Sequence, residues 1–146
     1  MTTLAVLRNG LFSTFTACGP YSATQISTCD YGVIERSTGC ALFFKPEEGS
    51  FEPITFGNTG NVSTKYGTIR FEGECYIQFT GDVPVFLGQV WTAIDDLRTT
   101  IGKDDTLQST ACMAYLSEFE YRPDEGYEMG GKDWGVVHWK VTIQDF

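Results

Sequence analysis

The chain has 146 residues and a formal net charge of −9 at neutral pH, from 19 acidic and 10 basic side chains. This length fits one domain around a single hydrophobic core, and 42% apolar with 20% charged residues is typical of a globular protein and excludes a disordered one. The acidic balance argues against a function that depends on broad contact with nucleic-acid phosphates, because such contact needs clustered Lys and Arg.

The sequence gives no sign of export, of a membrane span or of a metal site. Its first ten residues lack the basic and apolar regions of a signal peptide, and its longest uninterrupted apolar run, 40–44, is far shorter than the ~18 residues of a membrane span. The five cysteines form no C-x-x-C pair, and with one histidine they do not supply the four close ligands of a structural zinc site. We therefore expect reduced, mostly buried thiols, no metal and no cofactor.

The first predicted element is a helix. Apolar residues at 4, 7, 11 and 15 form one helical stripe, which Thr2 or Thr3 can cap and which Gly19-Pro20 ends. Gly10 weakens the middle of this helix, so the helix must depend on docking for its stability. Two short strands are predicted next, over 29–34 and over 40–45, with Pro46 ending the second.

The segment 47–64 is rich in Gly, Pro, Asn, Ser and Thr, and we expect it to form a long loop or to hold a short hairpin. Loops of this length inside a compact domain are usually functional or mobile, since most connections run to ~4–6 residues. Phe51, Ile54 and Phe56 are apolar side chains that a purely solvated linker would not need.

The clearest strand and the clearest helix follow each other. Residues 68–80 alternate with a period of two over nearly their whole length, which predicts an antiparallel strand with one buried face. From Asp82, a possible cap, an apolar stripe runs through 83, 87, 90, 94, 97 and 101, widened by Phe86 and Trp91. Gly102 is expected to take the left-handed conformation that ends this helix.

Two more strands complete the chain. The segment 110–121 is apolar on both faces, which indicates either a central strand or a subunit contact that involves Tyr115 and Phe119. The segment 134–146 buries alternate residues and places His138 on the outward face. The acidic segment 122–133 between them is expected to be a loop whose apolar groups, ringed by charge, suit a protein–protein contact.

This order of elements predicts one α+β domain over 1–146. We expect an antiparallel, possibly mixed, sheet of four to five strands, two helices packed on one face, long loops and an extended C-terminal hairpin. The candidate protein-interface residues are Phe51, Ile54, Phe56, Tyr115, Phe119, Arg122, Asp124, Glu125, Tyr127, Glu128, Met129 and Lys132.

No catalytic motif appears in the sequence. His138 could pair with Cys75 or Cys112 as a thiol nucleophile site, but both cysteines fall on apolar strand faces where burial makes a thiol inert. Pairs of adjacent carboxylates, such as Asp104-Asp105, are expected to belong to solvated surface or wet loops. We therefore expect no enzymatic activity.

The pattern resembles that of tail terminator or tail completion proteins of long-tailed bacteriophages. The resemblance lies in the N-terminal helix, the segments Cys-Asp-Tyr-Gly-Val-Ile-Glu (29–35) and Cys-Ala-Leu-Phe-Phe-Lys-Pro (40–46), the strand 68–80, the helix 87–101 and the ending Trp-Lys-Val-Thr-Ile (139–143). It implies a hexameric ring in the virion, built in the host cytoplasm, that caps the tail tube, stops its polymerisation and joins tail to head. The implied partners are identical copies, the tail tube protein and the head–tail connector proteins.

DNA would pass through such a ring without specific binding, and no membrane would be involved. As a hypothesis, a negative wall would help DNA to slide, since it repels phosphates. A head–tail connector adaptor or stopper is the nearest alternative, because short neck proteins share the same pattern. A small thiol-dependent hydrolase and a monomeric ligand-binding module are the alternatives from other classes.

Overall fold

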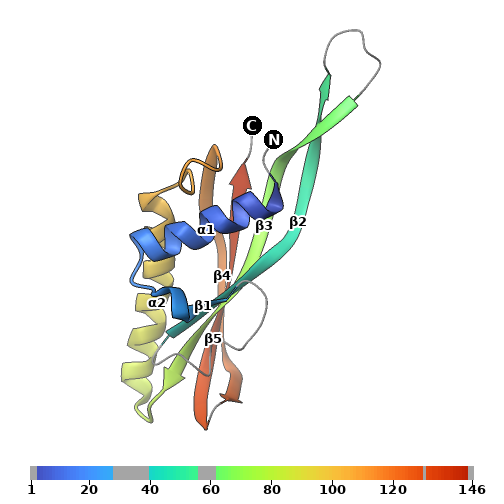
Figure 1. Cartoon of the computed structure of the whole chain (residues 1–146). Coiled ribbons are helices and arrows are strands. Elements are labelled where there is room, and N and C mark those ends of the chain that lie inside the picture. Colours follow the sequence, from blue (N-terminus) through green and yellow to red (C-terminus); the bar gives the residue numbers. More distant parts are fainter. Residues whose placement is uncertain (1–2, 28–39, 56–61, 130, 145–146) are drawn as a thin grey trace.

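A computed structural model describes residues 3–27, 40–55, 62–129 and 131–144. The elements, labelled in Figure 1, are α1 (Leu4–Cys18), the short 3₁₀ helix η1 (Ala23–Gln25), β1 (Ile26–Ser27), β2 (Cys40–Thr55), β3 (Val62–Phe79), α2 (Val83–Lys103), β4 (Met113–Met129) and β5 (Lys132–Gln144). The strand predicted over 29–34 and the candidate Phe56 lie outside the described residues.

The strands form one five-stranded sheet in the order β1-β2-β3-β5-β4. β2, β3, β5 and β4 are antiparallel to their neighbours, and β1 adds two residues in parallel to β2. This arrangement confirms the predicted α+β fold with its mixed sheet. β5 lies between β3 and β4, so β4 is an edge strand and the central option for 110–121 is wrong.

Both helices pack on the same face of the sheet and share one core with it. α1 contributes Leu7, Leu11 and Phe15 to this core, and the stripe of α2 contributes its buried residues from Phe86 to Ile101. The sheet contributes alternate side chains of its central strands, namely Ile69, Phe71, Cys75, Ile77, Val137, Trp139, Val141 and Ile143. The face that carries these side chains is called the helix face below, and the opposite one the outer face.

The helix starts follow the predicted capping chemistry. The Thr3 hydroxyl accepts a hydrogen bond from the backbone N–H of Val6, and the Asp82 carboxylate accepts one from Val85. The predicted end of α2 is wrong, because Gly102 lies inside the helix, which continues to Lys103 and is capped at Asp104, whose φ is −145° and ψ 75°.

The segment 47–64, predicted as a long loop or a short hairpin, belongs to the paired strands β2 and β3 in its described residues, so the long loop is wrong. β2 continues through Pro46 to Thr55 and pairs with β3 as far as Thr55 opposite Val62. Within the segment 47–64, residues 56–61 lie outside the described part of the chain. Proline is tolerated here because β1 pairs only with Leu42 and Phe43, so the rest of β2 has no described strand on its outer side.

The apparent double apolarity of 110–121 has a local cause. A register shift between Leu116 and Glu118 exchanges the two faces of β4. Ala114 and Leu116 before the shift, and Phe119 after it, therefore stand opposite helix-face residues of β5. The strand itself begins at Met113, after a loop of residues 104–112.

This loop is held in an unusual backbone conformation. Leu107, Gln108 and Ser109 have φ angles of 50°, 60° and 64°, a left-handed run that costs about 1–2 kcal/mol per residue outside glycine. Leu107 is fully buried in the core. The carboxylate of Asp104 accepts hydrogen bonds from the Thr14 hydroxyl, the Thr106 hydroxyl and the backbone N–H of Gln108. The Asp104 carboxylate therefore holds the loop through hydrogen bonds, and the expectation that it is only solvated is wrong.

The same hydrogen bonds change the acidity of this carboxyl group. Burial raises the pKa of Asp104, but the bonds from Gln108, Thr106 and Thr14 outweigh it and leave the pKa below its ordinary value. A lowered carboxyl pKa means that this contribution to stability is present at neutral pH and is lost as the pH falls through the folded pKa.

Gly10 explains how α1 approaches this loop. A Cβ at position 10 would lie 2.1 Å from Thr110 Oγ1 and 2.6 Å from the carbonyl oxygen of Leu107. A Cβ at Gly88, in α2, would meet no atom within 4 Å. The two helical glycines therefore differ in packing and share the same unfavourable helix propensity.

We expect Gly10→Ala to lower the free energy of unfolding by about 1–3 kcal/mol, because the added methyl overlaps backbone. Gly88→Ala is the matched control and should raise it by about 0.5–1 kcal/mol through helix propensity alone. Urea unfolding followed by circular dichroism measures both. Equal effects of the two substitutions would show that α1 does not pack this closely on the loop.

Candidate protein interface

The outer face of the sheet carries a ladder of opposite charges over three strands. In β5, Lys140 stands between Glu72 of β3 and Glu118 of β4. One step along, His138 stands between Glu74 and Glu120 in the same way. Opposite charges on neighbouring strands stabilise a sheet, and here His138 and Lys140 each face two carboxylates.

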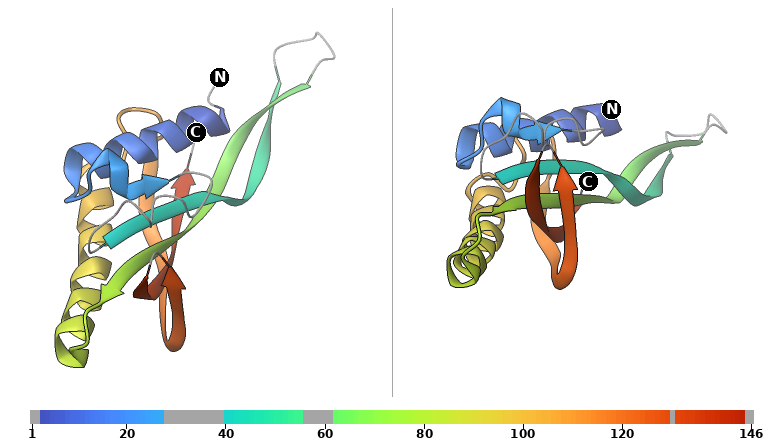
Figure 2. Two further views of the ribbon diagram at one scale, coloured as in Figure 1. Left: turned by 60° about the horizontal axis from the view of Figure 1, so that its bottom comes forward. Right: turned by 90° about the horizontal axis from the view of Figure 1, so that it is seen from below.

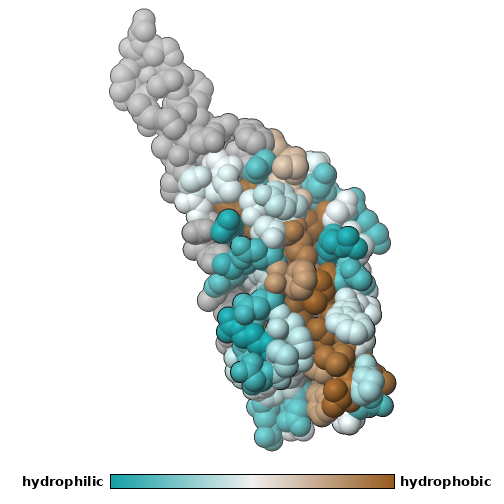
Figure 3. Space-filling model, turned by 180° about the vertical axis from the view of Figure 1, so that it is seen from behind, coloured by the Kyte–Doolittle hydropathy of each residue, from teal (hydrophilic) through white to brown (hydrophobic). Residues whose placement is uncertain are grey.

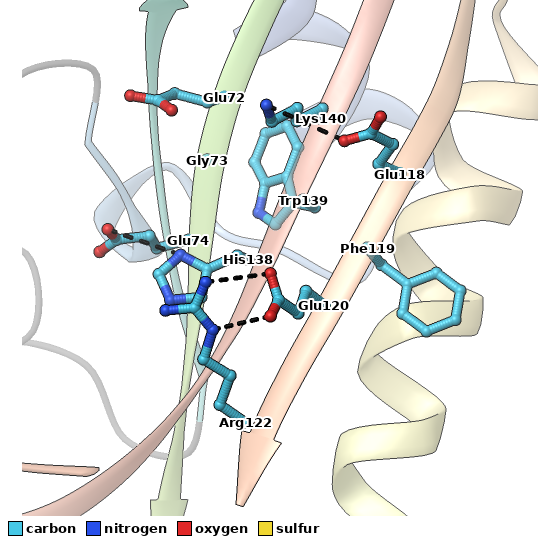
Figure 4. A pocket seen from close by; sticks show the side chains of 10 residues that line it. All are labelled: Glu72, Gly73, Glu74, Glu118, Phe119, Glu120, Arg122, His138, Trp139 and Lys140. Atoms are coloured by element: carbon cyan, nitrogen blue, oxygen red, sulfur yellow. Dashed lines mark hydrogen bonds and ion pairs between the residues drawn. The ribbon is translucent and has the colours of Figure 1, made fainter. Parts of the chain in front are cut away.

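These residues line a shallow pocket of about 570 Å³, drawn in Figure 4. Lys140 Nζ lies 3.9 Å from Glu118 Oε2, and His138 Nδ1 lies 3.9 Å from Glu74 Oε1. Arg122 Nε and Nη2 donate to the two oxygens of Glu120 over 2.7 and 3.1 Å. The Arg122 bonds lower the pKa of Glu120, and this carboxylate raises the pKa of Arg122 in turn.

A large bulge in β4 brings a further carboxylate to His138. Between the pairs Tyr121–Val137 and Gly126–Gly135, β4 has the four residues 122–125 and β5 has only Val136. The extra length carries Glu125 back over the outer face, where His138 Nε2 lies 2.9 Å from both of its oxygens. Bulges commonly redirect a side chain in this way.

Contacts other than the His138–Glu125 hydrogen bond also stabilise the bulge. The Tyr127 hydroxyl donates to Glu125 over 2.9 Å, and the ring of Tyr127 packs edge-on against Tyr76 with centroids 6.0 Å apart. Tyr76, Trp134 and Val136 are buried on the outer face and form a small second apolar cluster beside the bulge. The described residues of 122–133 therefore belong to the ends of β4 and β5, which pair as a hairpin, and the predicted loop is wrong for them.

The environment of Glu125 favours its ionised form. Burial raises the pKa of its carboxyl, but the hydrogen bonds with His138 and Tyr127 and the charges of His138 and Arg122 outweigh it and lower the pKa. The ionised carboxylate therefore stabilises the hairpin above its ordinary pKa, and this contribution is lost as the pH falls through the folded pKa.

The pocket offers acid and base groups but no thiol and no serine or threonine hydroxyl, since no Ser, Thr or Cys is among its lining residues. Cys75 is buried on the helix face opposite Val137, whereas His138 is on the outer face. Cys112 is exposed, not buried as expected. It donates its backbone N–H to Gln144, six residues or about 20 Å along β5 from His138. Neither Cys–His pair considered from the sequence is formed.

Metal ligands are likewise not gathered in the part of the chain that the structure describes, where no group of three or more His, Cys, Asp or Glu side chains could hold an ion. The helices found there contain no segment with the length and apolarity needed to cross a lipid bilayer.

A second surface is apolar and lies along α2 and the edge strand β4. Eight large apolar side chains are exposed in the described residues, and six of them belong to α2 or to the first half of β4. These six are Val83, Val85, Trp91, Met113, Tyr115 and Phe119. Figure 3 shows an apolar stripe running along the back of the molecule between polar flanks. We call residues 113–121 of β4 the β4 edge.

The structure separates the predicted interface residues into three groups. Tyr115 and Phe119 lie on the β4 edge, with Phe119 57% exposed. Arg122, Asp124, Glu125, Tyr127, Glu128, Met129 and Lys132 all belong to the β4–β5 hairpin, in which Arg122, Glu125 and Tyr127 are engaged in the contacts above. Phe51 and Ile54 lie on β2, in the part that extends past β5.

Sequence reasoning missed Trp91, which it assigned to the buried stripe of α2. Its side chain is 67% exposed. The sequence feature that indicates this exposure is the position of Trp91 directly after Val90, which is buried at the centre of the stripe. A residue one step along a helix is turned away by about 100°, so it leaves a narrow apolar face.

No protein-family model matches the chain, and no curated protein sequence matches it.

We expect Glu125→Gln to lower the free energy of unfolding at neutral pH by about 0.5–1.5 kcal/mol, since it replaces a charge-assisted hydrogen bond to His138. It should also flatten the loss of stability on acidification below about pH 4.5, the ordinary value for Glu. Glu128→Gln, an exposed residue of the same hairpin, is the control. If the stability of Glu125→Gln fell on acidification as steeply as that of the wild type, the assigned role of this carboxylate would be contradicted.

Proposed function

We propose that the protein is a structural subunit that assembles with identical copies into a ring, and that it acts as a tail terminator of a long-tailed bacteriophage. In this role the ring caps the tail tube, stops tail polymerisation and joins tail to head in the virion, without catalysis. The resemblance in the pattern of elements suggests the class of protein. The observation that supports self-assembly is the exposed apolar β4 edge.

The β4 edge has the properties of a contact surface. β4 is the last strand of the sheet, and no described strand pairs with its outer side. An edge strand presents a row of backbone N–H and C=O groups that can pair with another chain. Proteins usually protect such edges, and the second half of β4 is protected by the bulge and by Pro123. The first half, 113–121, contains no proline and carries exposed aromatic side chains.

The charge of the protein fits a ring through which DNA passes. The chain has a net charge of −9, and the outer face offers two carboxylates each to His138 and Lys140 of β5. A wall of this sign repels phosphates instead of retaining them. A head–tail connector adaptor, the second candidate, would share this requirement and the same contact surface.

We expect the purified protein to form a ring that electron microscopy can resolve, and Phe119→Lys to weaken its assembly. Aromatic side chains at the centre of a contact carry much of the binding free energy. A charge in this position should raise the dissociation constant by about tenfold or more, which corresponds to ~1.4 kcal/mol. Light scattering coupled to size-exclusion chromatography gives the oligomeric state over a range of concentrations.

Val6→Lys is the matched control for this substitution. Val6 is also an exposed apolar residue, at 41%, but it lies on α1. Assembly should therefore be unaffected by it. A wild-type protein that stays monomeric at high concentration, alone and with tail tube protein, would refute the proposal.

We also expect the protein not to bind duplex DNA at about 0.15 M salt, because the counterion release that drives such binding needs clustered cations. Fluorescence anisotropy with a labelled duplex measures this. Binding that weakens steeply with added salt would show a cationic surface, and would contradict a repelling channel.

A further inference from the structure

The ribbon made by the ends of β2 and β3 extends out of the sheet. β5 pairs with β3 only from Thr68 onward, whereas β2 and β3 stay paired as far as Thr55 opposite Val62. Residues 51–55 and 62–67, called the arm below, therefore form a ribbon that has two strands in the described part of the chain. Figures 1 and 2 show the arm pointing away from the helices and the rest of the sheet.

A two-stranded ribbon in water is only marginally stable without a third strand or a packing surface. The arm is about 20 Å long, from six residues at ~3.3 Å each. It cannot reach the β4 edge of its own chain by adding to the sheet, because β3 and β5 lie between β2 and β4. Among the described strands of the chain, none pairs with the outer sides of the arm, so a second copy of the chain can supply the neighbouring strand.

The two sides of the arm are not equivalent. β2 contains Pro53 within the arm, and proline lacks the backbone N–H that a neighbouring strand would need. The β3 side, 62–67, contains no proline. This side continues the line along which β3 pairs with β5 in the body of the sheet, so it is the side that can take a further strand.

The β4 edge matches this side of the arm in length and chemistry. Its nine residues, 113–121, contain no proline and exceed the six residues of 62–67 in number, although a paired strand must follow the register shift between Leu116 and Glu118. In a protein of net charge −9, copies repel each other. Residues 51–67 contain one acid, Glu52, and one base, Lys65, so the arm is neutral and adds no repulsion against Glu118 and Glu120.

We propose that the β3 side of the arm of one copy pairs with the β4 edge of the next copy. This inference rests on the proposed self-assembly and specifies its geometry. The contact joins two different surfaces, so every copy offers one arm and one β4 edge. Such a head-to-tail contact repeats from copy to copy and generates a ring when the rotation between copies closes. A two-fold contact between two β4 edges would instead stop at a dimer.

Two variants that are each defective on one side test this geometry. In the armless variant, Asn-Gly replaces residues 51–67 and joins Ser50 to Thr68, which already face each other in the register. Asn-Gly suits a two-residue hairpin turn. In the edge variant, Tyr115→Lys and Phe119→Lys place charges on two exposed positions of the β4 edge.

Each variant alone should be monomeric, because it keeps only one half of the contact. An equimolar mixture should form a one-to-one heterodimer and nothing larger, since the armless variant supplies an intact β4 edge and the edge variant supplies an intact arm. Native mass spectrometry separates the two chains by mass, and circular dichroism confirms that both are folded. If the armless variant does not fold, Thr64→Pro and Lys65→Pro are made separately, because neighbouring N–H groups of a strand point to opposite sides and only one of the two substitutions removes an outward N–H.

The outcomes separate this inference from the proposed function. If the wild type assembles and the armless variant assembles equally well, the arm is not part of the contact. If both folded variants are monomeric and their mixture stays monomeric, the head-to-tail pairing is wrong, although self-assembly stands. If the wild type itself does not assemble, the proposed function fails, and the pairing fails with it.

Discussion

The packing of Trp139 over Gly73 fixes how the helix layer meets the sheet. A Cβ at Gly73 would lie 2.1 Å from the indole ring of Trp139, so the ring occupies the space that a side chain would take on the neighbouring strand. Phe15 of α1 packs edge-on against the same indole, with centroids 5.6 Å apart, and Tyr21 packs against Phe15. One missing side chain on β3 thus sets the position of the central indole of β5 and, through it, the position of α1. Because the register of β5 is fixed here, the charges on the opposite face of the same strands are fixed as well.

The register that Trp139 sets in the core therefore also determines which charged residues stand opposite each other on the outer face. His138 and Lys140 flank Trp139 in sequence, and side chains alternate across a strand. With Trp139 opposite Gly73, His138 must stand opposite Glu74, and Lys140 opposite Glu72. A shift by one residue would turn the indole to the outer face and would break both pairs. The hydrogen bond between His138 and Glu125 follows from the same register, together with the bulge of β4.

The parts of the fold that follow regular periods could be predicted from the sequence, and the parts that depend on irregularities could not. The stripes of α1 and α2 and the alternation of 68–80 give both helices and the middle of the sheet. The bulges at Leu116/Glu118 and Tyr121/Gly126 interrupt the alternation of β4, so the hairpin looked like an acidic loop. The arm looked like a loop because its residues are polar or turn-forming and it contains Pro53. Of the candidate interface, Phe119 and Tyr115 followed from their apolar pattern, whereas the role of Glu125 depends on a pairing across strands that no local pattern contains.

The left-handed run at 107–109 has a consequence for how this protein balances stability. Gln108 and Ser109 are exposed, and glycine would adopt their φ angles without the steric penalty. The chain therefore holds an unfavourable conformation in place through the carboxylate of Asp104 and the burial of Leu107. The loop leads directly into the first residues of the β4 edge, where Ala114 donates its N–H to the carbonyl of Asp105. The strained backbone therefore lies directly before the β4 edge, the surface to which we assign assembly. Glycine at positions 108 and 109 would relieve this strain and raise the thermal stability.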